Sequence, residues 1–229
     1  MAANLTKKEL KQPDEFHTIG WKTMQYMSDH RSKFYTAGAV VLTIIILFGG
    51  WYFYHLNYED RAEQMYTAAY KSYSLPDNAD DMKDAYLIAV EIYTDLVEKY
   101  PDSRAATLSF YNMGNIYFNI GEIEKSIEAY KTFLKRSGKN NILTSLAYYG
   151  LGYCYEKNKN YDNALKSFED SDKGIKGTRF ESINYANMAR IYEKMSEQKK
   201  ALEFYRKSAE KASDPLMKMM VESRIATLS

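Results

Sequence analysis

Residues 113–130, MGNIYFNIGEIEKSIEAY, contain the spacing of small and aromatic residues that decides the fold of this chain. Gly114 is followed by Tyr117, Ser126 and Tyr130 at three, twelve and sixteen positions further on. The segment Asn119-Ile120-Gly121 between them has the composition of a turn. The pattern predicts two antiparallel helices that approach closely at the small residues, with the aromatic rings filling the space beside them.

The same spacing recurs twice further along the chain without a slip, at intervals of 38 and 37 residues. The later copies are Gly152, Tyr155, Ala164 and Phe168, with a turn at 157–160, and Ala189, Tyr192, Ala201 and Tyr205, with a turn at 195–197. An earlier unit shares only the second half, as Ala89, Tyr93 and Pro101. Alternating runs typical of strands are absent. The sequence therefore predicts an all-α solenoid of about four helical hairpins over residues 55–213.

This register resembles the tetratricopeptide repeat, which is marked by a Leu-Gly pair, a Tyr, an Ala and an aromatic residue. The pairs Met113-Gly114, Leu151-Gly152 and Met188-Ala189 occupy the first of these positions, and Tyr100-Pro101 supplies a repeat-ending proline. The resemblance covers about residues 58–213. Because each unit is a few residues longer than the standard repeat, we expect the excess between one hairpin and the next. The first helix of the first unit, 58–73, lacks the glycine and is expected to continue from the segment before it.

That preceding segment is apolar enough to cross a membrane. Residues 34–54, FYTAGAVVLTIIILFGGWYFY, carry no charge, and as a helix they would be about 30 Å long, the thickness of the hydrocarbon core of a bilayer. The 33 residues before them and the bulky Trp51–Tyr54 exit argue against a cleaved signal peptide. The sequence thus predicts a tail (1–33), a transmembrane helix (34–54), a repeat domain (55–213) and a C-terminal capping helix (214–229).

Basic residues predict the orientation of this span. The tail contains Lys7, Lys8, Lys11, Lys22, Arg31 and Lys33, whereas the 25 residues after the span contain only Arg61 and Lys71. By the positive-inside rule the tail is cytoplasmic, and the repeat domain lies on the other side of the membrane. We expect a single-pass protein of the bacterial inner membrane with a periplasmic C-terminal domain.

Composition disfavours enzymes and nucleic-acid binding. Acidic and basic residues nearly balance after the span, and no basic stripe is present. Of the three histidines, His17 and His30 lie in the tail and His55 lies at the membrane surface, and Cys154 is the sole cysteine. No phosphate-binding loop, metal-ligand cluster or nucleophile motif occurs. The interpretation is a non-enzyme with no cofactor or metal, although an enzyme that uses Asp and Glu stays open as a minor alternative.

Protein binding is the usual role of such arrays, through a concave surface made by the first helix of each hairpin. The resemblance to the tetratricopeptide repeat places twelve residues of this chain on that surface. They are Leu108, Tyr111, Asn115, Phe118 and Asn119, then Leu146, Tyr149, Tyr153 and Glu156, and then Ala186, Arg190 and Glu193. The alternative is that the tyrosines among them are ordinary packing residues.

The order of the parts also resembles the ancillary subunit of the bacterial Sec translocon. The shared features are the short charged tail, the Gly49-Gly50-Trp51-Tyr52 exit, the immediate helix from Glu59 and the Pro215…Ser229 ending. This resemblance implies a periplasmic chaperone or adaptor that binds translocon components and emerging proteins. The alternative is a scaffold in another envelope machine, because Lys99–Ser103 looks like a junction in repeat proteins of outer-membrane assembly and cell-division coordination.

Two further segments have helical patterns. Asp214-Pro215 begins a helix for which we expect one apolar face, made of Leu216, Met219, Met220, Ser223, Ile225 and Leu228. In the tail, Phe16, Ile19, Thr23, Met24 and Met27 share a helical face. That face could lie on the membrane surface, dock on a cytoplasmic partner or be a solvated lead-in to the span.

Overall fold

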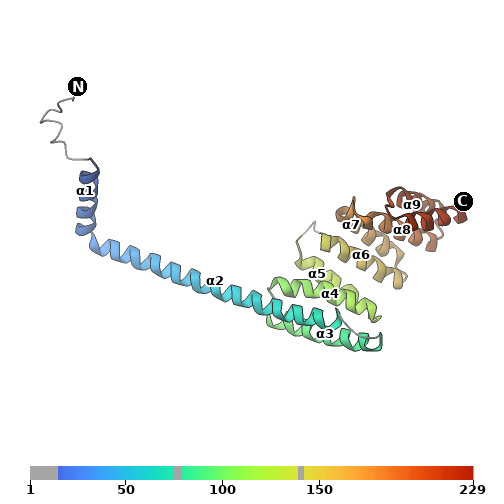
Figure 1. Cartoon of the computed structure of the whole chain (residues 1–229), viewed down its shortest axis with the longest axis horizontal. Helices are drawn as coiled ribbons and strands as arrows, with labels where there is room; N and C mark the ends of the chain where they lie inside the picture. Colours follow the sequence, from blue (N-terminus) through green and yellow to red (C-terminus); the bar gives the residue numbers. More distant parts are fainter. Residues whose placement is uncertain (1–14, 75–78, 139–141, 229) are drawn as a thin grey trace, which may run out of the picture. The chain divides into compact units, whose positions relative to one another are not determined.

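The computed structural model describes residues 15–74, 79–138 and 142–228, and these ranges form ten helices and no strand (Figure 1). Lys7, Lys8 and Lys11, which contribute to the predicted orientation, lie outside the described residues. The chain divides into two compact units, residues 1–57 and 58–229. The predicted all-α class and helical solenoid are confirmed.

The first unit contains α1 (Glu15–Asp29) and the beginning of α2 (Arg31–Ser74). In the described part of the chain, α2 alone is long and apolar enough to cross a membrane. None of its most apolar window is buried within the molecule. The apolar stretch is therefore a candidate span, judged by length, composition and exposure.

The first hairpin of the second unit is made by the end of α2 and by α3 (Ala79–Lys99). The expectation that its first helix continues from the apolar segment is confirmed, because α2 runs through both without a break. Ala69 of α2 packs with Ala89 and Tyr93 of α3 in one buried cluster. Glu59 of α2 accepts a hydrogen bond of 3.2 Å from the backbone N–H of Arg104, at the start of the next helix. A carboxylate at a helix N-terminus is favoured by the helix dipole.

Three hairpins follow at the predicted positions. They are α4 (Arg104–Asn119) with α5 (Ile123–Arg136), α6 (Ile142–Lys157) with α7 (Tyr161–Ile175), and α8 (Arg179–Lys194) with α9 (Gln198–Lys211). All three predicted turns separate the two helices of a hairpin. The hairpins are joined through residues 137–141 and 176–178, where the sequence predicts the additional residues of each unit.

The turns within these hairpins share one geometry. In the first, the N–H of Glu122 bonds the carbonyl of Tyr117, and the N–H of Gly121 bonds the carbonyl of Phe118. This pair of bonds is the Schellman motif, which requires a left-handed residue just after the helix. The three left-handed positions are Gly121 (φ 85°), Lys159 (φ 58°) and Ser196 (φ 61°). Only the first turn has the residue that adopts this conformation without strain.

Replacing Lys159 by glycine is therefore expected to stabilise the repeat domain by about 1 kcal/mol, because glycine adopts the left-handed conformation without the steric strain that a side chain causes. The gain is reduced by the greater freedom of glycine in the unfolded chain. Thermal and urea unfolding of the full chain in detergent would measure it. Gly121→Ala is the matched control and should destabilise the domain by a similar amount. A destabilising Lys159→Gly would contradict the assigned turn.

Close approach at the small residues is confirmed, and it extends between hairpins. A Cβ atom placed on Gly114 would lie 2.7 Å from the ring of Tyr130, and one on Gly152 would lie 2.5 Å from the ring of Phe168. A Cβ atom on Gly150, in the next hairpin, would lie 2.5 Å from the far end of the Tyr130 ring. The Tyr130 ring is thus held between two glycine backbones. The spacing of small and aromatic residues within one hairpin does not predict the contact between Tyr130 and Gly150, because the two residues belong to different hairpins.

The C-terminal helix α10 (Pro215–Leu228) packs on α9, and Asp214 caps its start by accepting a 3.0 Å bond from the N–H of Leu216. Its predicted apolar face was largely wrong. Met217, Val221, Ile225 and Leu228 face the array. Leu216, Met219, Met220 and Ser223 are instead exposed. Helical periodicity alone could not choose between the two apolar sides of α10.

Candidate protein-binding face

The predicted binding residues all lie on α4, α6 and α8, the first helices of three successive hairpins. Glu156 is buried, Asn119 is exposed, and the other ten are partly exposed. We call this surface the first-helix face. This surface forms because each hairpin repeats the same register. Equivalent side chains of α4, α6 and α8 therefore follow one another along the array.

On α4, the predicted residues are held by contacts inside the array. The Tyr111 ring packs on Tyr130 and Phe133, with centroids 6.1 and 5.5 Å away. Asn115 accepts a 2.7 Å hydrogen bond from the Tyr130 hydroxyl, which fixes the orientation of that buried ring. Asn119 donates to the Tyr86 hydroxyl at 3.2 Å and so joins α4 to α3. These side chains therefore help to hold the array together as well as forming its surface.

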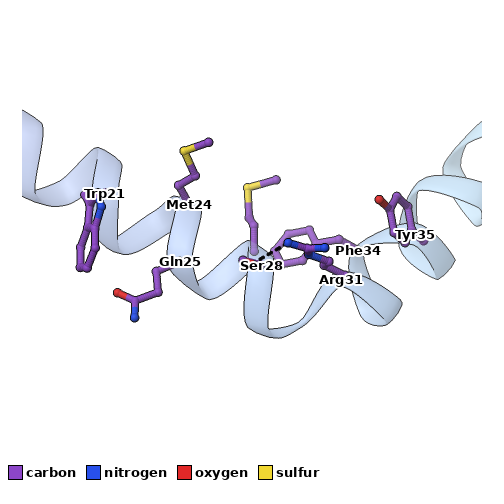
Figure 2. Close-up of a pocket in the computed structure, with 8 residues that line it drawn as sticks. Trp21, Met24, Gln25, Ser28, Arg31, Phe34 and Tyr35 are labelled. Atoms are coloured by element: carbon purple, nitrogen blue, oxygen red, sulfur yellow. Dashed lines mark hydrogen bonds between the residues drawn. The ribbon is translucent and has the colours of Figure 1, made fainter.

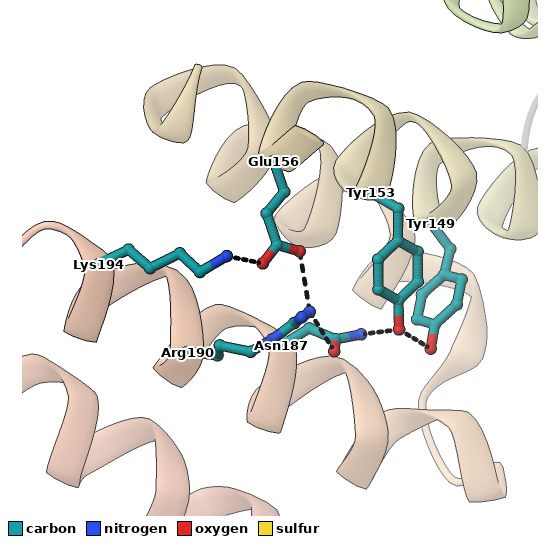
Figure 3. Close-up of polar contacts among 6 residues, drawn as sticks. All are labelled: Tyr149, Tyr153, Glu156, Asn187, Arg190 and Lys194. Atoms are coloured by element: carbon teal, nitrogen blue, oxygen red, sulfur yellow. Dashed lines mark hydrogen bonds and ion pairs between the residues drawn. The ribbon is translucent and has the colours of Figure 1, made fainter. Parts of the chain in front are cut away.

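A continuous polar network joins α6 to α8 (Figure 3). The hydroxyls of Tyr149 and Tyr153 lie 2.8 Å apart, and Asn187 donates to the Tyr153 hydroxyl at 2.9 Å. Asn187 in turn accepts from Arg190 at 3.0 Å. Each of these polar groups has a partner within the network, as buried and half-buried groups require.

The network ends at one carboxylate between two cations. Glu156 has only 7% of its side chain exposed and accepts from Arg190 at 2.9 Å and from Lys194 at 2.7 Å. The Arg190 guanidinium also lies over the Tyr153 ring, 5.6 Å from its centroid. Because both cations are about two-fifths exposed, the pair of them carries positive charge to the surface. Glu156 is thus a structural acceptor that positions Arg190 and Lys194.

A pocket of about 300 Å³ lies at this position and has mostly cationic walls. It is lined by Tyr153, Glu156, Lys157, Lys159, Tyr161, Arg190 and Lys194. Four basic side chains thus surround one carboxylate that is already paired with two of them. Lys157 and Lys159 are exposed. The excess of positive charge favours an acidic ligand at this end of the first-helix face.

Glu193 belongs to a different set of contacts. Its carboxylate accepts from the Tyr205 hydroxyl at 2.6 Å and from Nη2 and Nε of Arg224 at 2.6 and 3.2 Å. It therefore ties α8 to α9 and to the C-terminal helix. Burial, reinforced by this carboxylate, raises the pKa of Tyr205 to about 12. The phenol thus remains a proton donor to Glu193 at neutral pH.

Burial also raises the pKa values of Tyr130 and Tyr149 well above the ordinary range for phenols. The bond between the Tyr149 and Tyr153 hydroxyls acts in the same direction on Tyr149. Both phenols remain neutral at physiological pH. Their roles are consequently packing and hydrogen bonding.

Sequence reasoning did not include Asn187 or Lys194 among the binding residues. Lys194 occupies the register position of Asn119 in the α4 hairpin, and Asn187 occupies that of Asn112. Asn112 also bonds tyrosine hydroxyls, donating to Tyr66 and Tyr93 at 2.9 Å each. The repeat of a buried Asn at one register position was the signal that could have found Asn187.

In the described ranges, no group of three or more His, Cys, Asp or Glu side chains is arranged to hold a metal ion. Cys154 is buried beside Ser126, with Sγ and Oγ 3.1 Å apart, and burial raises the pKa of its thiol. A raised pKa disfavours the reactive thiolate.

Comparison with known proteins supports the repeat assignment. Residues 111–174 and 184–212 each match a family model of the tetratricopeptide repeat. No curated protein matches the sequence. The resemblance to the tetratricopeptide repeat is therefore supported over these two ranges.

Solved structures show the same fold at low sequence identity. A structure described as MamA RS-1 ArsTM double mutant is 14% identical, with a TM-score of 0.55 over 74% of this chain and 94% of that one. A putative kinesin light chain of Podosopora anserina, with nearly identical TPR-like repeats, is 13% identical, with a TM-score of 0.57 over 73% and 85%. Another MamA structure is 19% identical, with a TM-score of 0.50 over 65% and 73%. Arrays of this fold are protein-interaction scaffolds and typically have no catalytic chemistry of their own.

Proposed function

We propose that this chain is a membrane-anchored scaffold that binds protein partners through the first-helix face of its repeat domain. The observation that carries the proposal is α2, a single 44-residue helix that joins an exposed apolar stretch to the first hairpin. A core helix of a soluble protein would bury this stretch, whereas Ile44, Ile45, Leu47 and Phe48 are each about 60% exposed or more. Lipid is the environment in which such a surface is stable.

We further propose that the repeat domain is periplasmic and the tail cytoplasmic, as the basic residues favour. An adaptor or chaperone associated with the Sec translocon is the first candidate, supported by the order of tail, span, helical array and C-terminal helix. A scaffold of another envelope machine is the second candidate. Both would use the same surface for a protein partner.

The chemistry of the first-helix face favours a partner with an acidic segment. Its α6–α8 end presents Arg190, Lys194, Lys157 and Lys159 around the pocket described above. Next to these cations, the half-buried rings of Tyr149 and Tyr153 offer rigid apolar area. An extended segment could pair its carboxylates with the lysines and pack its apolar groups on the rings.

Reversal of two exposed charges tests this binding mode. Lys157→Glu with Lys159→Glu is expected to weaken binding of a fluorescent Glu- and Asp-rich peptide at least about tenfold, or 1.4 kcal/mol. Fluorescence anisotropy with the full chain in detergent, at two salt concentrations, measures the change. Lys135→Glu with Lys199→Glu is the matched control, because it makes the same charge change on the second helices α5 and α9. Equal losses in both variants would show general attraction, and unchanged binding would place the acidic site elsewhere.

Reporter fusions test the topology. A reporter that is active only in the periplasm, fused after Ser229, is expected to be active, and a cytoplasm-only reporter at the same position is expected to be silent. Fusion of the same pair before Met1 should give the reverse result. An active cytoplasmic reporter after Ser229 would contradict the proposed orientation.

A further inference from the structure

We propose that α1 lies in the headgroup layer of a phospholipid membrane, with its apolar face toward the acyl chains. This inference deepens the proposed function and rests on the membrane span proposed for residues 34–54. It assigns to α1 a lipid partner and a position along the membrane surface.

The sequence of α1 has two faces. At helical spacing, Phe16, Ile19, Thr23, Met24 and Met27 lie on one side, and Glu15, Lys22, Gln25 and Asp29 lie on the other. Side chains are described from Gly20 onward, and among them Trp21 is 68%, Met24 75% and Met27 46% exposed. A helix with one exposed apolar face and one charged face is the usual form of a helix that lies in a membrane interface.

An open hollow of about 530 Å³ borders this apolar face, shares Met24 and Met27 with it, and extends to the first turns of α2 (Figure 2). Its walls are Trp21, Met24, Gln25, Met27, Ser28, Arg31, Phe34 and Tyr35. Five of these eight side chains are apolar or aromatic. The only charged group is the Arg31 guanidinium, which donates one hydrogen bond of 3.1 Å to the Ser28 hydroxyl. Its other N–H donors can serve a lipid phosphate while the apolar walls contact an acyl chain.

The position of α1 along the chain favours lipid over a protein partner. Only His30 separates α1 from α2, and the uncharged stretch begins at Phe34, so α1 ends fewer than two helical turns before the proposed span. Arg31 and Lys33 flank that boundary, where cationic side chains meet phosphates. Trp21 lies between the apolar and polar faces, a position that tryptophan favours at a membrane interface.

The two tryptophans allow each part to be tested separately. Trp51→Phe leaves Trp21 as the only tryptophan, and Trp21→Phe leaves Trp51 in the apolar stretch. Each full-length variant is reconstituted into vesicles of phosphatidylethanolamine and phosphatidylglycerol that carry a nitroxide at a shallow or a deep acyl position. We expect Trp21 to be quenched mainly by the shallow label, with blue-shifted emission, because interfacial helices lie about 5–10 Å below the headgroup boundary.

A change to the apolar face should release α1 from the membrane. In the Trp51→Phe background, Met24→Gln with Met27→Gln is expected to abolish shallow quenching of Trp21 and to shift its emission to that of solvated tryptophan. Lys22→Gln with Asp29→Gln changes the polar face without changing net charge, and quenching should be retained. Loss in the polar-face variant, or retention in the methionine variant, would overturn the assigned face.

The outcomes separate this inference from the proposed span. If Trp51 is quenched and Trp21 is not, α1 does not lie in the membrane although the span stands. Blue-shifted but unquenched Trp21 emission would mean that α1 docks on protein, which also overturns the inference. If neither tryptophan is quenched by lipid labels, the membrane span itself is wrong.

Discussion

Gly152→Leu is expected to destabilise the repeat domain by roughly 3 kcal/mol, the upper part of the range for overpacking a tight core. A Cβ atom at this position would already lie 2.5 Å from the Phe168 ring, and leucine adds three further carbons. For a domain of this size the thermal midpoint should fall by about 6–12 °C. Circular dichroism of the full chain in detergent would follow the change.

Two further variants show whether the contact is the cause. Gly138→Leu is the matched control, because a Cβ atom at Gly138 meets no other atom within 4 Å, and its midpoint should change little. Gly152→Leu combined with Phe168→Ala should recover part of the loss, since the leucine can occupy space left by the ring. Strictly additive losses in the double variant would argue against direct contact.

Tyr130→Ala is expected to have the largest effect, a loss of about 3–5 kcal/mol, as for other large aromatic residues removed from a core. The ring is 2% exposed and fills the space between Gly114 and Gly150, so its removal leaves a cavity bounded by two backbones. Urea unfolding monitored by circular dichroism measures the change in stability.

Tyr130→Phe is the control for the ring, because it keeps the volume and removes only the hydroxyl that donates to Asn115. It should cost about 1 kcal/mol, the usual net value of one hydrogen bond. Equal costs for the two variants would mean that the hydrogen bond, and not the packing of the ring, dominates.

The hairpins could be predicted from the sequence because their register depends on local pairs. Each pair, Gly114 with Tyr130 and Gly152 with Phe168, lies on two helices that are joined by one short loop. Helical spacing then determines which side chains of the two helices meet. The left-handed turn at Gly121 follows from composition, whereas Lys159 and Ser196 adopt the same conformation only because the packed helices impose it.

Contacts between hairpins could not be predicted in the same way. The packing of the Tyr130 ring against Gly150 depends on how two hairpins stack. The pairing of Glu156 with Arg190 and Lys194 depends on which rotamers reach across from α6 to α8. The candidate face was thus predicted as a set of helices and positions. Which of its residues make contacts inside the array, and which present cations to a ligand, could be seen only in the folded structure.

The Tyr130 ring, shared by two hairpins, also bears on how the array opens. Because the ring fills space against Gly114 and Gly150 at once, separation of the α4–α5 hairpin from α6 exposes the ring and removes its packing against Gly150. Helices α5 and α6 should therefore exchange their amide protons in one cooperative event of high energy. At the C-terminal end, α10 packs mainly on α9 and leaves Leu216, Met219 and Met220 in solvent, so it can fray alone. Amide protection in the repeat domain then decreases from this shared aromatic ring toward the C-terminus.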